Sequence, residues 1–181
     1  ALKARPGAPE ILFQRSVALR GLGLLREAEA MLDKALAKRP DFHPALLSRG
    51  YLRQGRGDRQ GALADFEEAI ALRKDDSQGY VGRAHALSSS NLKEDLDKAA
   101  ADLDKALALS PGSVDLYPER AAVHLTRYDF DAALADLSSA IKVNPRNADL
   151  YVRRGRVYRD RATADQEDAG LAAAEADLSA A

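Results

Sequence analysis

The chain has 181 residues, of which 46% are hydrophobic, so it is long enough to bury a sizeable core in one domain. Its 36 Ala and 26 Leu far outnumber its 7 Val, 3 Ile and 2 Thr, a balance that favours helices and argues against a sheet-rich fold. The absence of Cys excludes disulfides, iron–sulfur clusters, thiolate zinc sites and cysteine catalysis, and the net charge of -1 argues against a general nucleic-acid binder.

Five consecutive segments of the chain share one pattern of residues. We expect them to cover residues 9–42, 43–76, 77–113, 114–147 and 148–181 of a single array that spans 1–181. The third carries a three-residue insertion and the fifth a seven-residue insertion, and the last helix reaches the chain end without a cap, which suggests that the array continues. Each segment predicts a first helix, a short turn and a second helix, because Gly, Ser, Asp, Asn and Pro gather between the helical stretches.

Two features define the repeat. The first helix of every segment carries an arginine, and these arginines are 34, 34, 37 and 34 residues apart: Arg15, Arg49, Arg83, Arg120 and Arg154. The second helix carries a skeleton of Ala, then Leu or Phe four residues later, then Ala three residues after that, as in Ala62, Phe66 and Ala69. Steps of four and three keep the skeleton on one helix face, and its small residues allow another helix to approach closely.

This 34-residue helix–turn–helix unit resembles the tetratricopeptide repeat family, and the match covers residues 9–181. It departs from the family pattern at Leu12 and Leu46, where an aromatic residue is usual, and at Lys74, where a Pro would close the second repeat. The resemblance implies an all-α fold, a right-handed α-solenoid (superhelix) of antiparallel helix pairs. It also implies that the first helices line a concave groove that holds a peptide or a partner helix.

The recurring arginines have acidic counterparts in the second helices. An aspartate precedes the large skeleton residue in four repeats, at Asp65, Asp102, Asp136 and Asp177, whereas the first repeat has Met31 there. We predict structural ion pairs between these aspartates and Arg49, Arg83, Arg120 and Arg154, because a feature present in every repeat serves stacking. The alternative is an arginine ladder that binds anions. Arg15 has no aspartate in its own repeat and is expected to be unpaired.

Positions of the first helices that lie opposite the skeleton are expected to face the groove and to bind the partner. They are Phe13, Val17, Leu47, Tyr51, Gln54, Val81, His85, Arg153, Arg156 and Arg159, with Pro118, Ala122 and Leu125 in the fourth repeat. This surface is apolar and aromatic in the first two repeats and basic in the last. We therefore expect an apolar anchor of the partner near Phe13, Leu47 and Tyr51 and acidic residues near the three arginines.

The sequence offers no catalytic motif and no cofactor or metal motif. Its three histidines, His43, His85 and His124, fall in different repeats and lack the spacing of a metal site. The Ser run at 88–90 is typical of a turn, and the Gly-rich stretches lack the strand and the Gly-Lys pair of a phosphate loop. The Lys and Asn residues with which some relatives clamp a chaperone tail are absent from the groove positions.

We therefore expect a non-enzymatic scaffold that binds protein or peptide, without nucleic acid, cofactor or membrane insertion. Self-association into a homo-oligomer and a substrate-recruiting arm of a larger enzyme are the alternatives. The N-terminal sequence lacks the apolar core of a signal peptide, no apolar run is long enough to span a membrane, and the chain begins without Met, which suggests a piece of a longer protein. Cytoplasm and periplasm both stay open, and the wealth of Ala, Arg and Asp suggests a bacterial source.

Overall fold

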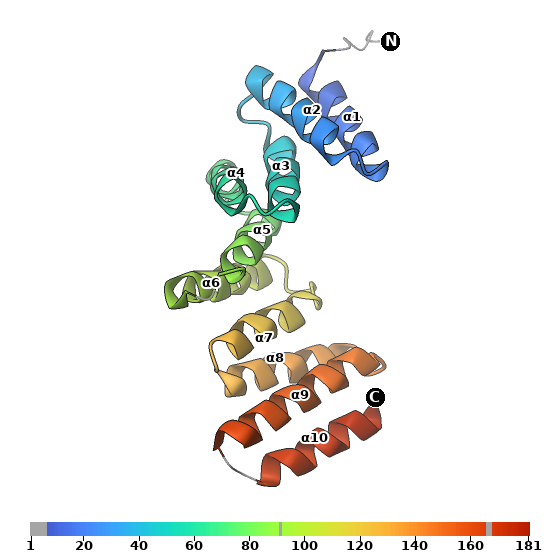
Figure 1. Ribbon diagram of the computed structural model, residues 1–181, viewed down its shortest axis with the longest axis vertical. Helices are drawn as coiled ribbons and strands as arrows, with labels where there is room; N and C mark the ends of the chain where they lie inside the picture. Colours follow the sequence, from blue (N-terminus) through green and yellow to red (C-terminus); the bar gives the residue numbers. More distant parts are fainter. Residues whose placement is uncertain (1–6, 91, 166–167) are drawn as a thin grey trace. The chain divides into compact units, whose positions relative to one another are not determined.

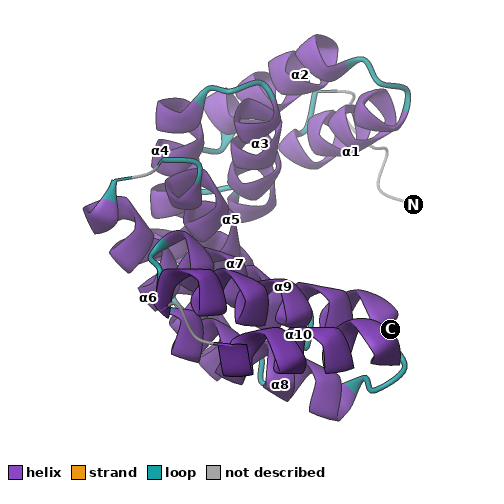
Figure 2. Ribbon diagram, turned by 60° about the horizontal axis from the view of Figure 1, so that its bottom comes forward, coloured by secondary structure: helices purple, strands orange, loops and turns teal. Residues whose placement is uncertain are grey.

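The computed structural model describes residues 7–90, 92–165 and 168–181, with the side chains of 165 and 168–172 left aside. The described residues form ten α-helices joined by short loops, and no strand occurs among them (Figures 1 and 2). The chain divides into two compact parts, Ala1–Leu87 and Ser88–Ala181, called the N-terminal half and the C-terminal half below.

The helices come in pairs in both halves. In the N-terminal half, α1 (Pro9–Gly21) packs against α2 (Leu25–Lys38), and α3 (His43–Gly55) packs against both α2 and α4 (Arg59–Leu72); α5 (Ser77–Ser88) follows. In the C-terminal half, α6 (Lys93–Leu109) contacts α7 (Leu116–Thr126), which pairs with α8 (Phe130–Val143). Finally, α9 (Ala148–Asp165) contacts α8 and pairs with α10 (Asp168–Ala180). Four of the predicted repeats, 9–42, 43–76, 114–147 and 148–181, thus each contain two helices that pack together.

The two insertions lengthen helices rather than loops. The second helix of the third repeat, α6, has 17 residues, whereas α2, α4 and α8 have 14 each. The first helix of the fifth repeat, α9, has 18 residues, whereas α1 and α3 have 13. Residues 91 and 166–167, which belong to the inserted stretches, lie outside the described residues.

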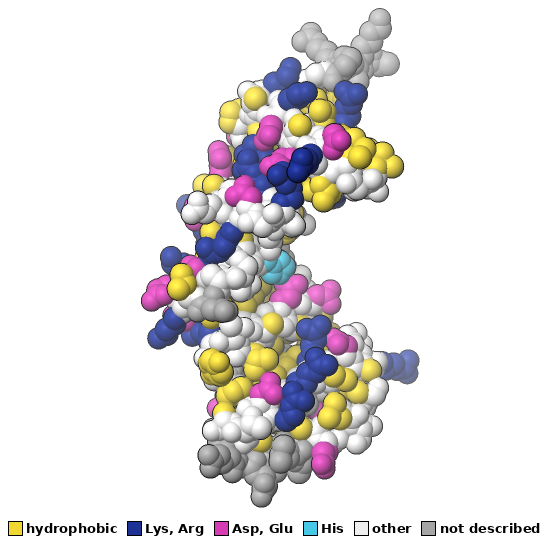
Figure 3. All heavy atoms as spheres, viewed as in Figure 1, with side chains coloured by type: hydrophobic (Ala, Val, Ile, Leu, Met, Phe, Trp, Pro, Cys, Tyr) yellow, Lys and Arg dark blue, Asp and Glu magenta, His cyan; other side chains and the backbone are white. Residues whose placement is uncertain are grey.

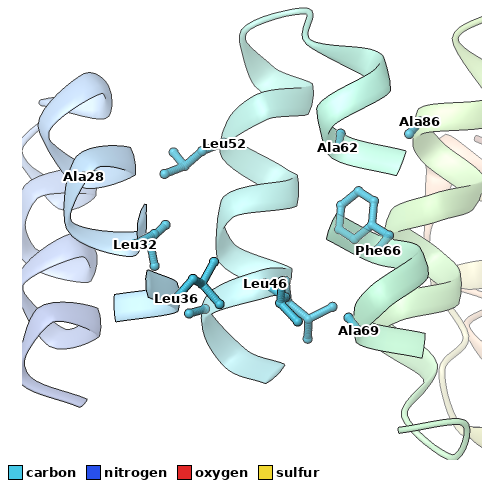
Figure 4. Close-up of a cluster of buried hydrophobic side chains, with 11 residues drawn as sticks. Ala28, Leu32, Leu36, Leu46, Leu52, Ala62, Phe66, Ala69 and Ala86 are labelled. Carbon is cyan, nitrogen blue, oxygen red and sulfur yellow. The ribbon is translucent and has the colours of Figure 1, made fainter. Parts of the chain in front are cut away.

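The skeleton of the second helices forms the core. Its large members Leu32, Phe66, Leu103 and Leu137 are all buried, and so are the alanines on either side of them. In the N-terminal half, Phe66 fills the space between α3 and α5, next to Leu46 of α3 (Figure 4). Each such side chain contributes about 2 kcal/mol to stability on leaving water.

The turn inside a helix pair has a fixed conformation in three repeats. Its second residue takes a positive φ, 76° at Gly23, 82° at Gly57 and 60° at Tyr128. Glycine adopts this left-handed region without a steric penalty, whereas a residue with a Cβ does not. The next residue caps the second helix in two repeats, since the Asp58 and Asp129 carboxylates accept hydrogen bonds from the backbone N–H groups of Gly61 and Ala132.

Candidate functional site

The arginines of the first helices reach across to the aspartates of their own helix pairs. Arg120 donates from Nε and Nη2 to the two carboxylate oxygens of Asp136, over 2.9 and 2.5 Å. Arg154 and Asp177 form the same fork, with both distances 2.7 Å. Arg49 binds Asp65 in the same way, at 2.6 Å from Nη2 and 3.0 Å from Nε. Two parallel charge-assisted bonds fix the angle between the helices as well as their distance.

A second partner of each of these arginines belongs to the preceding helix pair. The Nη1 group donates to Asp33 from Arg49 (2.8 Å), to Asp104 from Arg120 (2.5 Å) and to the Ser138 hydroxyl from Arg154 (3.1 Å). All three acceptors directly follow the large skeleton residue of their own helix. These acceptors were not predicted from the sequence, although a polar residue that recurs directly after the large skeleton residue is a recognisable pattern.

Because the guanidinium groups of these three arginines already bind two acceptors each, they are not available to bind an anion. Hydrogen bonds that Arg120 and Arg154 donate to Asp136 and Asp177 raise the pKa of both arginines. Burial works to lower the pKa of Arg49, but its bonds to Asp65 and Asp33 raise it on balance. In the remaining predicted pair, Asp102 is buried and the Arg83 guanidinium lies 6.0 Å from the centre of the Tyr80 ring. Arg15 is exposed.

The predicted groove residues of the N-terminal half are more tightly packed than expected. Phe13 and Tyr51 are half-buried, with ring centres 5.5 Å from Phe42 and 5.0 Å from Phe66, and the Tyr51 hydroxyl donates to the Gln78 carbonyl over 3.2 Å. The placement of Leu47 on the exposed groove face is wrong: it is 6% exposed and belongs to the buried cluster. Because α3 packs against both α2 and α4, its surface cannot be divided simply into one buried face and one exposed face.

The other predicted groove residues of this half retain some exposure. Val17 is 36% exposed, and Gln54, Val81 and His85 are half-buried. Phe13 and Tyr51 pack against the buried cluster to which Leu47 belongs, and an apolar anchor of the partner near these residues stays a prediction.

The C-terminal half brings predicted groove residues of α7 and α9 together around a hollow. Pro118, Ala121, Ala122 and Leu125 of α7, Leu137 of α8, and Arg153, Arg156 and Val157 of α9 line it, around a volume of about 170 Å³. Its lining is mostly apolar, with two guanidinium groups. In the space-filling view, Lys and Arg side chains lie beside apolar ones over α7 to α9 (Figure 3). An apolar group next to a carboxylate matches this combination.

The three arginines of α9 differ in how their charges are balanced. Arg153 lies 2.5 Å from the Asp149 carboxylate one turn earlier, and Arg159 lies 3.2 Å from that of Asp160. Arg159 does not line the hollow, whereas Arg153 and Arg156 do. Arg156 is exposed and forms no ion pair with any residue that the structure describes. It therefore supplies the uncompensated positive charge at the hollow.

The histidines do not gather into a site. His43 is buried, with Nε2 3.5 Å from Asp76, and burial lowers its pKa. His124 lies between Asp129 and Asp136, at 3.7 and 3.8 Å. Within residues 7–90, 92–165 and 168–181, no group of three His, Asp or Glu side chains is arranged to hold a metal ion. Nor does any helix in this part of the chain combine the length and the apolarity that crossing a bilayer demands.

The architecture that these elements define is an all-α solenoid of helix pairs tied by repeated arginine–aspartate forks. No protein-family model matches the sequence, and no curated protein matches it. Solved structures do resemble the fold. A MamA protein superposes with a TM-score of 0.78 at 19% identity, covering 93% of this chain and 91% of its own.

Two further structures carry the repeat in their descriptions. A tetratricopeptide repeat protein from Parabacteroides merdae has a TM-score of 0.78 at 22% identity, covering 97% of this chain and 65% of its own. YrrB, described as a TPR protein with an unusual peptide-binding site, has a TM-score of 0.76 at 17% identity, covering 97% of this chain and 89% of its own. The chain therefore has the tetratricopeptide-repeat fold, and the expectation drawn from its 34-residue repeat is confirmed.

Proposed function

We propose that the chain is a non-enzymatic protein-interaction scaffold and that the hollow between α7 and α9 binds a segment of a partner protein. An apolar side chain of that segment rests against Ala122 and Leu125, and an adjacent carboxylate pairs with Arg156. The observation that carries this proposal is Arg156, which is exposed, pairs with no described residue and lies at the rim of a mostly apolar hollow. YrrB, with the same fold and a peptide-binding site in its description, lends support by analogy.

The stacking arginines and the groove arginines have separate roles in this proposal. Arg49, Arg120 and Arg154 each bind two acceptors and hold helix pairs in register. Arg156 has no such acceptor within the described part of the chain, so a ligand carboxylate would not have to displace a described partner. A charge at the rim of an apolar contact chiefly raises the association rate and selects acidic partners.

Selection from a phage-displayed library of random peptides tests the proposal. Peptides selected on the chain should combine an apolar residue with Asp or Glu, and they should bind more weakly as salt rises. Arg156→Glu should weaken their binding by about tenfold or more, because an attraction becomes a repulsion. Ala122→Gln, on an exposed helical position, should weaken it by filling the hollow without disturbing the core.

Arg146→Glu is the matched control. Arg146 is exposed and lies in the same half, but it does not line the hollow. Arg146→Glu makes the same change in net charge as Arg156→Glu but away from the hollow, so it should leave peptide affinity nearly unchanged. Equal losses in Arg146→Glu and Arg156→Glu, or peptides without acidic residues, would count against the proposed site.

One observation favours self-association as a second candidate function. Leu178 holds the skeleton position of α10 but is 54% exposed, whereas Leu32 and Phe66 at the same position are fully buried. A second copy that packs on this face of α10 would cover it. Sedimentation velocity at several concentrations tests this candidate: wild type should form a dimer that Leu178→Gln weakens, and a wild type that stays monomeric throughout rules it out.

A further inference from the structure

We propose a second docking site, at the turn between α7 and α8, where the Tyr128 ring anchors an apolar and acidic segment of a partner protein. This site adjoins the hollow lined by Pro118 and Arg156, with which it shares Leu125, and it does not depend on the function proposed for that hollow. It rests on the conformation and exposure of Tyr128, on two hollows that flank it and on the charge of Lys93.

The backbone of Tyr128 adopts a conformation for which the chain elsewhere uses glycine. Its φ is 60°, and the matching turn residues of the first two repeats are Gly23 and Gly57, with φ of 76° and 82°. A bulky residue with positive φ is strained, and strained residues persist mainly where they serve a function. The same turn forms with glycine in two repeats, so its geometry does not require a tyrosine.

The Tyr128 side chain does not contribute to the core. It is 80% exposed, and its ring meets the Phe130 ring edge-on with the centres 6.4 Å apart. Tyrosine offers a large, rigid contact area with a hydroxyl at its tip, which makes it a common anchor in interfaces. The strained residue therefore places its aromatic ring in solvent and not in the core.

Two hollows adjoin the ring on different elements. One, of about 560 Å³, is lined by Lys93 and Leu96 of α6 and by residues 126–129. The other, of about 470 Å³, is lined by Leu125 and Thr126 of α7, Phe130 of α8, and Asp160, Thr163 and Ala164 of α9. Tyr128 lines both. A bound segment that crosses the ring can therefore place one side chain on each side of it.

The charges around the first hollow select the partner. Arg127 is paired with Asp97 at 2.9 Å, and the Asp129 carboxylate caps α8. Lys93 is exposed and pairs with none of the side chains that the structure describes. Its ammonium group is thus the uncompensated charge of this hollow, which favours an acidic residue beside the apolar ones in the partner segment.

The probe is a phage-displayed library of random peptides, selected on the wild-type chain and then assayed as labelled synthetic peptides. One set of selected peptides should lose about tenfold or more in affinity with Tyr128→Gly and with Tyr128→Asn. Both substitutions tolerate the left-handed conformation, so the turn survives without the ring. The same peptides should bind Lys93→Glu several-fold more weakly and should bind Arg156→Glu as well as wild type.

Thermal unfolding separates this role from a structural one. Tyr128→Gly should melt at the same temperature as wild type or higher, because it removes strain and leaves the core intact. The proposal is overturned if every selected peptide binds Tyr128→Gly as well as wild type, or if Tyr128→Gly melts at a lower temperature. It is also overturned if Tyr128 instead drives a concentration-dependent dimer in sedimentation, since the occupant would then be a second copy of the chain.

Discussion

The aromatic ring of Phe66 lies directly against the backbone of Gly82. A Cβ placed on Gly82 would come within 2.3 Å of the ring, and one placed on Gly50 within 2.7 Å. Phe66 is the one phenylalanine at a skeleton position that carries Leu in the other four repeats. The larger side chain fits in the second repeat because glycines of α3 and α5 face it from two sides.

Gly82→Ala should therefore destabilise the N-terminal half by about 1–3 kcal/mol, since a contact of 2.3 Å forces the ring or a helix to move. Chemical denaturation measures the loss. The effect should be much smaller in a Phe66→Leu background, where the smaller side chain leaves room for the methyl group. Gly55→Ala is the control, because its added methyl group meets nothing within 4 Å. Equal costs in the two backgrounds would show that Gly82 is needed for another reason.

The sequence predicts this part of the fold well, because a fixed period specifies it. Ala62, Phe66 and Ala69 follow steps of four and three, which place them on one helix face whatever surrounds them. The sequence does not predict that Gly82 packs against Phe66. That relationship joins residues of different repeats, and the 15 residues between them in the sequence do not determine their distance, which depends on how the helices stack.

The same distinction explains the results for the candidate site. Arg120 and Asp136 recur at fixed places within a repeat, so their partnership is readable as a pattern. Asp104, the second acceptor of Arg120, belongs to the preceding repeat and was missed. Leu47 was placed on the exposed face by its position on one helix, but its burial depends on neighbouring helices. Sequence periodicity reports which face a residue occupies, not how many helices cover that face.

Removing Arg120 should destabilise the C-terminal half strongly. Arg120→Met would leave the buried Asp136 carboxylate without its bidentate partner, at a cost of roughly 3 kcal/mol. The double variant Arg120→Met/Asp136→Leu should recover much of that loss, because it leaves no buried charge. Arg161→Met is the control, since Arg161 pairs with an Asp131 side chain that is 84% exposed, and such surface pairs contribute at most about 1 kcal/mol. Urea titrations of the four proteins provide the comparison, and a similar loss from Arg120 and Arg161 would contradict a structural role for the fork.

At the left-handed turn residues, adding a side chain and removing one should have opposite effects on stability. Gly57→Ala should lower stability by about 1 kcal/mol, because alanine meets a steric penalty at a φ of 82°. Tyr128→Gly should raise stability by up to about 1 kcal/mol, because it relieves that penalty. The gain is limited because glycine loses more conformational entropy than tyrosine when the chain folds. Differential scanning calorimetry resolves both shifts. Stabilisation by Gly57→Ala would mean that the turn relaxes out of the left-handed region.

Stability should depend on pH through His43. Burial lowers the pKa of this imidazole, opposed by the Asp76 carboxylate 3.5 Å from Nε2 and assisted by the charge of Arg73. The folded state therefore binds its proton less readily than the unfolded state, whose histidine titrates near pH 6.5. The contribution is fully present above that pH and is lost as the pH falls from about 7 towards 5.

Urea unfolding across this range should show a fall in stability that His43→Gln reduces, and an NMR titration should place the His43 pKa below that of a model peptide. Asp76→Asn removes the opposing negative charge and can still accept a hydrogen bond from the Gln78 backbone N–H, as Asp76 does over 2.9 Å. It should lower the His43 pKa further and steepen the loss of stability. A His43 pKa above the model-peptide value would mean that the pairing with Asp76 outweighs burial, and stability would then increase rather than decrease as the pH falls through this window.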